Sequence, residues 1–147
     1  MSSTTRCLLD VNVLIALIDP AHVRHDNAHH WFAGKGKKAC ATCPITENRV
    51  LRIVGNARYP SSPGNPAAVA DILLVLRNLG SHEFWHDDIS LLDRNAADVT
   101  RLLNSAQVTD SYLLALAKAH GGLLATFDRQ LVADAVVGGS SALHHIR

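Results

Sequence analysis

Four acidic residues, far apart in the chain, have the surroundings expected of clustered ligands. Asp10 and Asp128 each follow a short apolar run that predicts a buried strand. Glu47 and Asp110 each precede apolar residues three, four and seven positions later, which places both on the inward stripe of a predicted helix. Strand exits and helix starts meet at one edge of a parallel sheet. The sequence therefore predicts one acidic cluster.

The chemistry of such a cluster follows from its charge. Carboxylates that lie close together repel one another unless a cation holds them. Oxygen ligands of this kind suit Mg²⁺, with Mn²⁺ as a plausible substitute. The reaction typical of such sites is phosphodiester hydrolysis, in which the metal activates a water and stabilises the leaving oxygen. We therefore expect a metal-dependent hydrolase of phosphodiester bonds.

Each acid taken alone also has a purely structural interpretation. Asp10, Asp110 and Asp128 could cap the helices predicted to begin beside them. Glu47 could extend its long side chain along the end of its helix into solvent. These alternatives remain open for each residue. All four acids are nevertheless expected at the same edge of the predicted sheet, and this common location favours the metal site.

The elements that must position these acids alternate between strands and helices. Strands are predicted over residues 7–9, 39–42, 123–127 and 142–146, with a further extended segment over 83–86. Helices are predicted over residues 11–18, 22–33, 44–54, 66–79, 95–104, 109–120 and 130–136. This alternation predicts an α/β fold with a parallel sheet covered on both faces.

Size and composition indicate one globular domain spanning residues 1–147. Hydrophobic residues form 48% of the chain and charged residues 18%, a balance that excludes a disordered protein. No apolar run is long enough to cross a bilayer, and the N-terminus lacks a signal-peptide core, so we expect a cytoplasmic protein. Three cysteines, an odd number, favour a reducing compartment over a disulfide framework.

Basic residues give a weaker signal. The net charge is only +1, so the chain as a whole does not have the charge of a nucleic-acid-binding domain. Local clusters exist at residues 35–38 and at Arg49, Arg52 and Arg58. Either cluster could contact nucleic acid or form an ordinary solvated face.

A second enzymatic interpretation rests on Cys40 and Cys43. They form a Cys-x-x-Cys motif at a strand end, before a helix that begins with Pro44, which is the placement of a thiol–disulfide motif. A single motif of this kind is a weak signal, and it leaves the four acids unexplained.

The acidic segments carry a resemblance to a known family. Residues 8–14, Thr46-Glu47, residues 108–113 and residues 125–129 match, in order and spacing, the motifs of PIN-domain ribonucleases. The chain resembles in particular the VapC toxins of bacterial VapBC toxin–antitoxin systems. The resemblance implies a three-layer α/β/α sandwich with a central, mostly parallel sheet.

The same resemblance implies a function and a site. Asp10, Glu47, Asp110 and Asp128 would form the catalytic acids and metal ligands, with Asp10 and Asp110 the firmest ligands. Asn12 and Thr126 would support them. The implied activity is that of a Mg²⁺-dependent endoribonuclease, the toxin component of a type II toxin–antitoxin system. Its partners would be RNA, a cognate antitoxin and a second copy of the chain, without a membrane. The alternatives are a non-catalytic PIN-like binding module or, less favoured, the thiol oxidoreductase.

Overall fold

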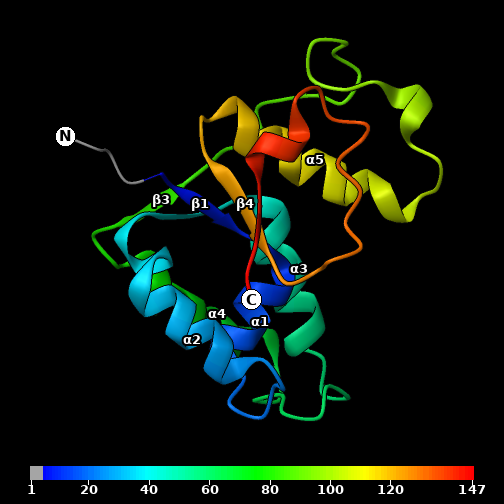
Figure 1. Cartoon of the computed structure of the whole chain (residues 1–147). Helices are drawn as coiled ribbons and strands as arrows, with labels where there is room; N and C mark the ends of the chain where they lie inside the picture. Colours follow the sequence, from blue (N-terminus) through cyan, green and yellow to red (C-terminus); the bar gives the residue numbers. More distant parts are fainter. Residues whose placement is uncertain (1–4) are drawn as a thin grey trace.

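A single parallel sheet organises the chain (Figure 1), whose computed structural model describes residues 5–147. The strand order is β3-β2-β1-β4-β5, and every strand pair is parallel. The strands are β1 (Cys7–Leu9), β2 (Cys40–Thr42), β3 (His82–Phe84), β4 (Leu123–Thr126) and β5 (Leu143–His145). The extended segment predicted over residues 83–86 is thus a strand of the sheet. Because β1 and β4 are neighbours, with Leu9 opposite Ala125, their exits lie side by side.

Within residues 5–147, five α-helices cover the sheet, and the predicted three-layer α/β/α architecture is confirmed. They are α1 (Val11–Ile18), α2 (His25–Gly34), α3 (Pro44–Val54), α4 (Pro66–Arg77) and α5 (Ala106–Ala119). Along β1, Cys7 and Leu9 pack into the core shared with α1 to α4, whereas Leu8 packs into the core beneath α5. Figure 1 shows α2 and α4 together on one side of the strands and α5 on the other. None of the helices within residues 5–147 has the length and apolarity to cross a bilayer.

Two predicted helices, over residues 95–104 and 130–136, are wrong. The first segment contains only a short 3-10 turn (Val99–Arg101), and the second contains no helix. The two segments bond to each other instead: the Asp98 amide donates to the Ala135 carbonyl at 2.8 Å, and the Val137 amide donates to the Ala96 carbonyl at 3.1 Å. These backbone groups are taken by a distant partner rather than by the same segment. The second segment also packs Leu131 and Val136 into the core beneath α5.

Two helix boundaries also differ from the prediction. Helix α2 begins at His25, three residues later than expected, because a turn first joins the His22 amide to the Asp19 carbonyl at 3.0 Å. Helix α5 begins at Ala106, three residues earlier than expected. Asp110 therefore lies in the second turn of α5 and not in its first. The capping interpretation of Asp110 is wrong for this reason.

The three cysteines belong to the core. Cys7 and Cys40 pack on the α1 side of the sheet, whereas Cys43 packs on the α5 side, and none is accessible to solvent. Burial raises the pKa of all three thiols, that of Cys40 to about 11. A thiol–disulfide motif needs an accessible thiol with a lowered pKa. The structure therefore contradicts the oxidoreductase interpretation.

We expect the native protein to resist thiol reagents. Burial keeps the three thiols protonated and out of reach, so none should react with iodoacetamide at pH 7.5 until the chain unfolds. Mass spectrometry after timed labelling, with and without urea, measures this directly. Rapid labelling of Cys40 or Cys43 in the folded protein would contradict the assignment.

The start of β4 depends on a close approach at Gly122. A Cβ atom at this position would lie 2.6 Å from the Arg6 carbonyl oxygen and 2.8 Å from the Trp85 ring. The same Arg6 oxygen accepts the Leu123 amide at 3.0 Å, which begins the pairing of β4 with β1. Only glycine leaves this contact undisturbed.

Gly122→Ala should therefore lower the free energy of unfolding by about 1–3 kcal/mol, as overpacking does in other cores. Urea denaturation followed by circular dichroism measures the change. Gly80→Ala is the matched control, because a methyl group there would meet no atom within 4 Å and the backbone is unstrained. Equal stability of the two variants would show that the close approach has no energetic weight.

Candidate active site

Asp10 is held at the exit of β1 by hydrogen bonds to both carboxylate oxygens. Oδ1 accepts the Val11 amide at 2.8 Å, so Asp10 does cap α1, as one interpretation of the sequence proposed. Oδ2 accepts the Thr126 hydroxyl, also at 2.8 Å. The residue is only 5% exposed, and burial raises its pKa although both hydrogen bonds oppose the rise. The cap and the acidic site therefore share one residue.

The two predicted supporting residues tie β1 to β4 at this point. The Thr126 hydroxyl donates to Asp10 and accepts from the Asn12 side-chain amide and the Asp128 backbone amide, both at 3.0 Å. The Asn12 side-chain oxygen in turn accepts the Phe127 amide at 3.1 Å. Asn12 lies farther from Asp10 itself, at 3.5 Å. It therefore orients Asp10 mainly through Thr126.

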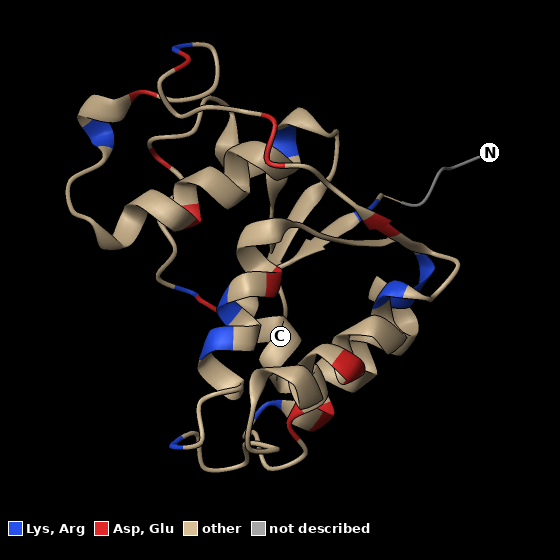
Figure 2. Ribbon diagram, turned by 180° about the vertical axis from the view of Figure 1, so that it is seen from behind, with Lys and Arg blue, Asp and Glu red and all other residues tan. Residues whose placement is uncertain are grey.

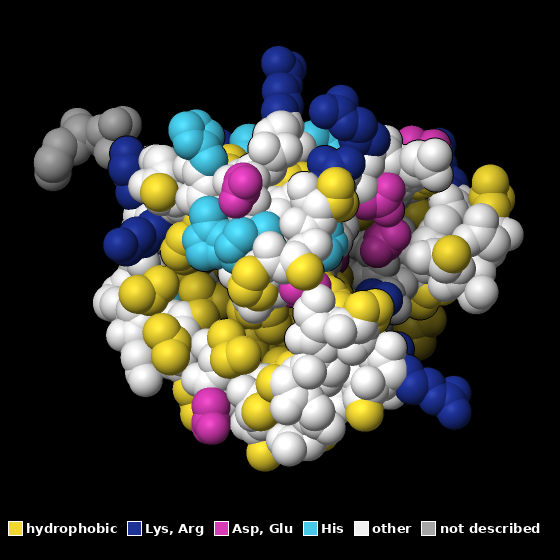
Figure 3. Space-filling model, turned by 90° about the horizontal axis from the view of Figure 1, so that it is seen from below, with side chains coloured by type: hydrophobic (Ala, Val, Ile, Leu, Met, Phe, Trp, Pro, Cys, Tyr) yellow, Lys and Arg dark blue, Asp and Glu magenta, His cyan; other side chains and the backbone are white. Residues whose placement is uncertain are grey.

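Beside these residues is a hollow of about 520 Å³, which we call the acidic hollow. Three predicted acids, Asp10, Asp110 and Asp128, line it together with Arg49. Figure 3 looks onto the molecule from the side toward which the strands run and shows acidic side chains in a hollow to the right of centre. The structure thus brings together three acids that are separated by up to 118 positions in the sequence, from Asp10 to Asp128.

Asp110 is the acid in the hollow whose ionised form is most disfavoured by its surroundings. Among the residues that the structure describes, no hydrogen-bond donor contacts its carboxylate. Burial raises its pKa to about 6, with further contributions from the negative charges of Asp10 and Asp128, while Arg49 opposes the shift. Asp128 is better accommodated, because its Oδ1 accepts the Gln130 amide at 2.9 Å.

Glu47, the fourth predicted acid, does not line the acidic hollow. Its Oε2 accepts the Thr42 hydroxyl at 2.7 Å and lies 3.5 Å from Arg77 Nε. The buried stripe of α3 runs through Thr46, Val50 and Val54. Successive helical residues turn by about 100°, so Glu47 and Arg49 project from opposite flanks of that stripe. The flank that faces the acids carries Arg49. The ligand role of Glu47 stays a prediction.

Arg49 is the site residue that sequence reasoning did not assign. It is half-buried in the acidic hollow, and its charge lowers the pKa values of both Asp10 and Asp110. Its spacing of three from Arg52 is the signal in the sequence, because such residues share a helix face. Figure 2 shows the two basic positions following one another along α3.

A divalent cation fits the character of the acidic hollow. Within residues 5–147, no three acidic, histidine or cysteine side chains converge closely enough to enclose one, so the acids would have to move closer together to bind it. The donors are nonetheless carboxylate oxygens, the type that Mg²⁺ and Mn²⁺ prefer. Asp110 has an unpartnered carboxylate whose pKa is raised by burial and by the charges of its acidic neighbours, and a cation would relieve this repulsion.

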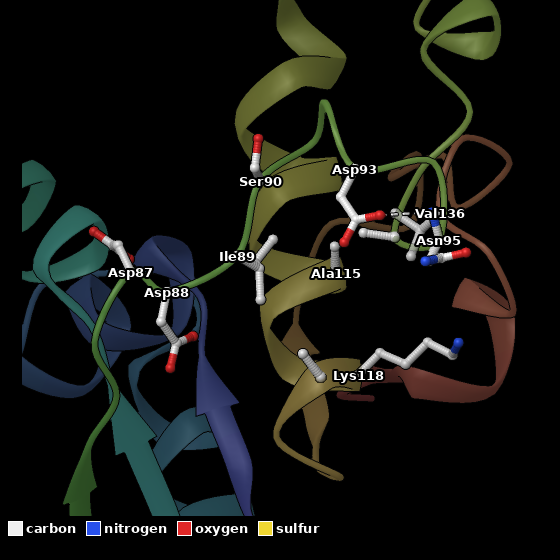
Figure 4. Close-up of a pocket in the computed structure, with 11 residues that line it drawn as sticks. Asp87, Asp88, Ile89, Ser90, Asp93, Asn95, Ala115, Lys118 and Val136 are labelled. Atoms are coloured by element: carbon white, nitrogen blue, oxygen red, sulfur yellow. Dashed lines mark hydrogen bonds between the residues drawn. The ribbon is translucent and has the colours of Figure 1, made fainter.

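A second acidic hollow lies on the outer side of α5 and lacks these features (Figure 4). Its acids Asp87, Asp88 and Asp93 come from one loop after β3. Asp93 accepts the Asn95 amide at 2.9 Å, and Asp88 contacts His120 Nε2 at 3.2 Å. In Figure 4 the Asp87 side chain points away from the others. Asp93 and Asp88 therefore already have partners, unlike Asp110 in the first hollow.

Comparison with known proteins agrees with the fold and with the family that the sequence resembles. Residues 7–135 match the PIN domain. Ribonuclease VapC44 of Mycobacterium tuberculosis is 44% identical over 92% of this chain and 94% of its own length, and Ribonuclease VapC39 of the same organism is 42% identical over 89% and 94%. The crystal structure of M. tuberculosis VapC20, titled a sarcin–ricin loop cleaving toxin, aligns with a TM-score of 0.61 at 18% identity, over 89% of this chain and 96% of that one. The chain belongs to the PIN-domain family and, within it, to the VapC ribonucleases.

Proposed function

We propose that this protein is a Mg²⁺-dependent endoribonuclease and the toxin component of a type II toxin–antitoxin system, with Mn²⁺ able to replace Mg²⁺. The observation that carries the proposal is the grouping of Asp10, Asp110 and Asp128 in one hollow, where burial and the charges of Asp10 and Asp128 raise the pKa of Asp110. The relatives named ribonucleases supply the substrate class, RNA. A cognate antitoxin and homodimerisation belong to the same proposal, by analogy with the family.

Each residue of the acidic hollow has a role in this proposal. Asp110 and Asp128 would hold the cation, with Asp10 contributing the oxygen that Thr126 orients. When bound, the cation supplies positive charge that activates water and stabilises the leaving oxygen. Arg49 lies beside the acids and would balance the charge of the incoming phosphate. At a pH near or below 6, where Asp110 still carries a proton, cation binding would displace that proton.

Glu47 enters the proposal with a condition. Its carboxylate must leave the Thr42 hydroxyl and Arg77 before it can reach a cation in the acidic hollow. In its observed position, Glu47 instead joins the start of α3 to the end of β2 through its hydrogen bond with Thr42. Its contribution to catalysis is therefore expected to be smaller than that of Asp110.

Asp110→Asn should abolish RNA cleavage while the fold survives. The substitution preserves the shape of the side chain and removes the charge that attracts the cation, which is worth about 100-fold or more in rate. The measurement is cleavage of labelled RNA in Mg²⁺, compared with the same reaction in EDTA. The matched control is Asp93→Asn in the outer hollow, which we expect to retain wild-type rates.

Two outcomes would contradict this proposal. Full Mg²⁺-dependent activity of Asp110→Asn would show that the site is misassigned. Absence of any RNA cleavage by the wild type, across Mg²⁺ and Mn²⁺, would instead favour the non-catalytic binding module.

The raised pKa of Asp110 predicts how stability depends on pH. The pKa is about 6 in the fold and 3.8 in a free side chain, so the folded protein binds this proton more tightly. Its contribution is fully present below about pH 4 and is lost as pH rises through about 6. Without a divalent cation, Asp110→Asn should therefore gain stability over the wild type as pH rises from 4.5 to 7.5, and added Mg²⁺ should stabilise only the wild type.

Thermal unfolding in EDTA and in Mg²⁺, at closely spaced pH values, tests this. The difference in Tm between the two proteins isolates Asp110 from the other titrating groups. A difference that stays constant across pH 5–7 would contradict the shifted pKa.

A further inference from the structure

The surface beside the acidic hollow continues as a groove along α3. A small hollow lined by Asn48, Arg49, Arg52 and Thr109 shares Arg49 and Thr109 with the acidic hollow. It shares Arg52 with a third hollow of about 760 Å³ at the far end of the helix. The three hollows therefore adjoin one another along one flank of α3, and we call this row of hollows the α3 groove. It leads from the acids to the loop after α3.

The groove is lined by three arginines that form no close ion pair with a described acid. Arg49 and Arg52 lie three residues apart on one face of α3, and Arg58 lies in the loop that follows. Within residues 5–147, the ion pairs involve other residues and none of these three. Arg49 lies beside the three acids of the acidic hollow, so the local excess of positive charge lies farther along the groove, at Arg52 and Arg58. They are available to a ligand with spaced negative charges.

The one acid of the far hollow does not cancel this charge at the surface. Asp19 is only 5% exposed, and its carboxylate accepts the Tyr59 hydroxyl and the Ala21 amide. These hydrogen bonds lower the pKa of Asp19, so it stays ionised as an internal anchor. Its effect is to fix the Tyr59 ring in the wall of the hollow.

The far hollow combines apolar and hydrogen-bonding surface. Ile53, Tyr59 and Pro60 provide the apolar part, and Arg52 and Arg58 flank it. His22 also lines it; its Nδ1 accepts the Arg24 amide, which leaves the Nε2 proton as a donor. A volume of about 760 Å³ lies within the range of small-ligand sites and accommodates a nucleotide. Aromatic surface beside arginine is the pattern that binds a base and its phosphate in single strands.

We propose that the α3 groove binds single-stranded RNA next to the scissile phosphate. Arg49 and Arg52 contact consecutive phosphates beside the acids. A nucleotide farther along lies against Tyr59 and Ile53, with its phosphate on Arg58. This inference rests on the proposed ribonuclease function, since it takes RNA as the ligand, and it names the path of the strand over this chain.

The test compares two double variants with equal change of charge. The groove variant, Arg52→Gln with Arg58→Gln, removes the two positive charges of the far part of the groove. The control variant, Arg94→Gln with Arg101→Gln, removes two arginines outside the groove, of which Arg101 is paired with Asp98. The probe is a fluorescein-labelled single-stranded RNA of about 16 nucleotides, the upper end of site sizes for single-strand-binding modules. Anisotropy in EDTA, with the RNA checked for integrity, gives Kd over a range of salt concentrations.

We expect the groove variant to bind about tenfold more weakly, with a salt slope reduced by about 1.4, the value for two lost phosphate contacts on a single strand. The control variant should match the wild type. In Mg²⁺, the groove variant should show a raised KM with little change in kcat, because it loses binding that ground state and transition state share. Urea denaturation of both variants separates a lost contact from a damaged fold, because unfolding alone does not change the salt slope.

The outcomes distinguish this inference from the proposed function. If both variants bind RNA with the same Kd and the same salt slope, the proposal that the α3 groove binds RNA is wrong, whether or not the wild type cleaves RNA. The same holds if the groove variant loses only the binding of a protein partner. If the wild type binds RNA through the groove but cleaves none, the proposed RNA-binding groove is supported and the proposed ribonuclease activity is wrong.

Discussion

The site depends on the parallel pairing of β1 with β4. This pairing places two strand exits next to each other, and the Thr126 hydroxyl then reaches across to Asp10 at 2.8 Å. The same hydroxyl accepts the Asp128 amide, so the backbone that carries the second acid is fixed by the side chain that orients the first. A buried carboxylate is costly unless it is hydrogen-bonded. Here the hydrogen bonds that reduce this cost also set the position of the site.

The acidic hollow balances attraction and repulsion at close range. Asp10 has hydrogen-bond donors at both oxygens, whereas Asp110 faces two like charges and one arginine, and no donor among the described residues contacts it. The fold therefore tolerates an electrostatically unfavourable acid at this place. Such strain is common where a ligand later supplies the missing charge. It is the physical link between the stability of the metal-free chain and the cation-dependent activity that we propose.

Helix α3 separates two sets of charged contacts. On one flank, Glu47 joins Thr42 and Arg77 and so holds the helix against the end of β2 and α4. On the other flank, Arg49 and Arg52 line the groove that begins at the acids. The divide is a buried stripe that includes Thr46, whose hydroxyl bonds to the Cys43 backbone and can therefore be buried. One helix thus contacts the end of β2 on one flank and forms the floor of the groove on the other.

Local sequence patterns determined most of the framework of this protein. Apolar runs mark β1 and β4, and an acid directly after each run must lie at the strand exit, because the backbone connection leaves it no other place. Tertiary structure decided what local patterns could not contain. Residues 95–104 and 130–136 have helical sequence patterns, yet in the fold their backbone groups form hydrogen bonds between the two segments. Glu47 follows the apolar pattern of α3, but burial of Thr46 rotates the inward stripe and turns Arg49 toward the acids instead. Helix rotation and long-range pairing depend on contacts between segments distant in sequence, and for that reason only the folded chain specifies them.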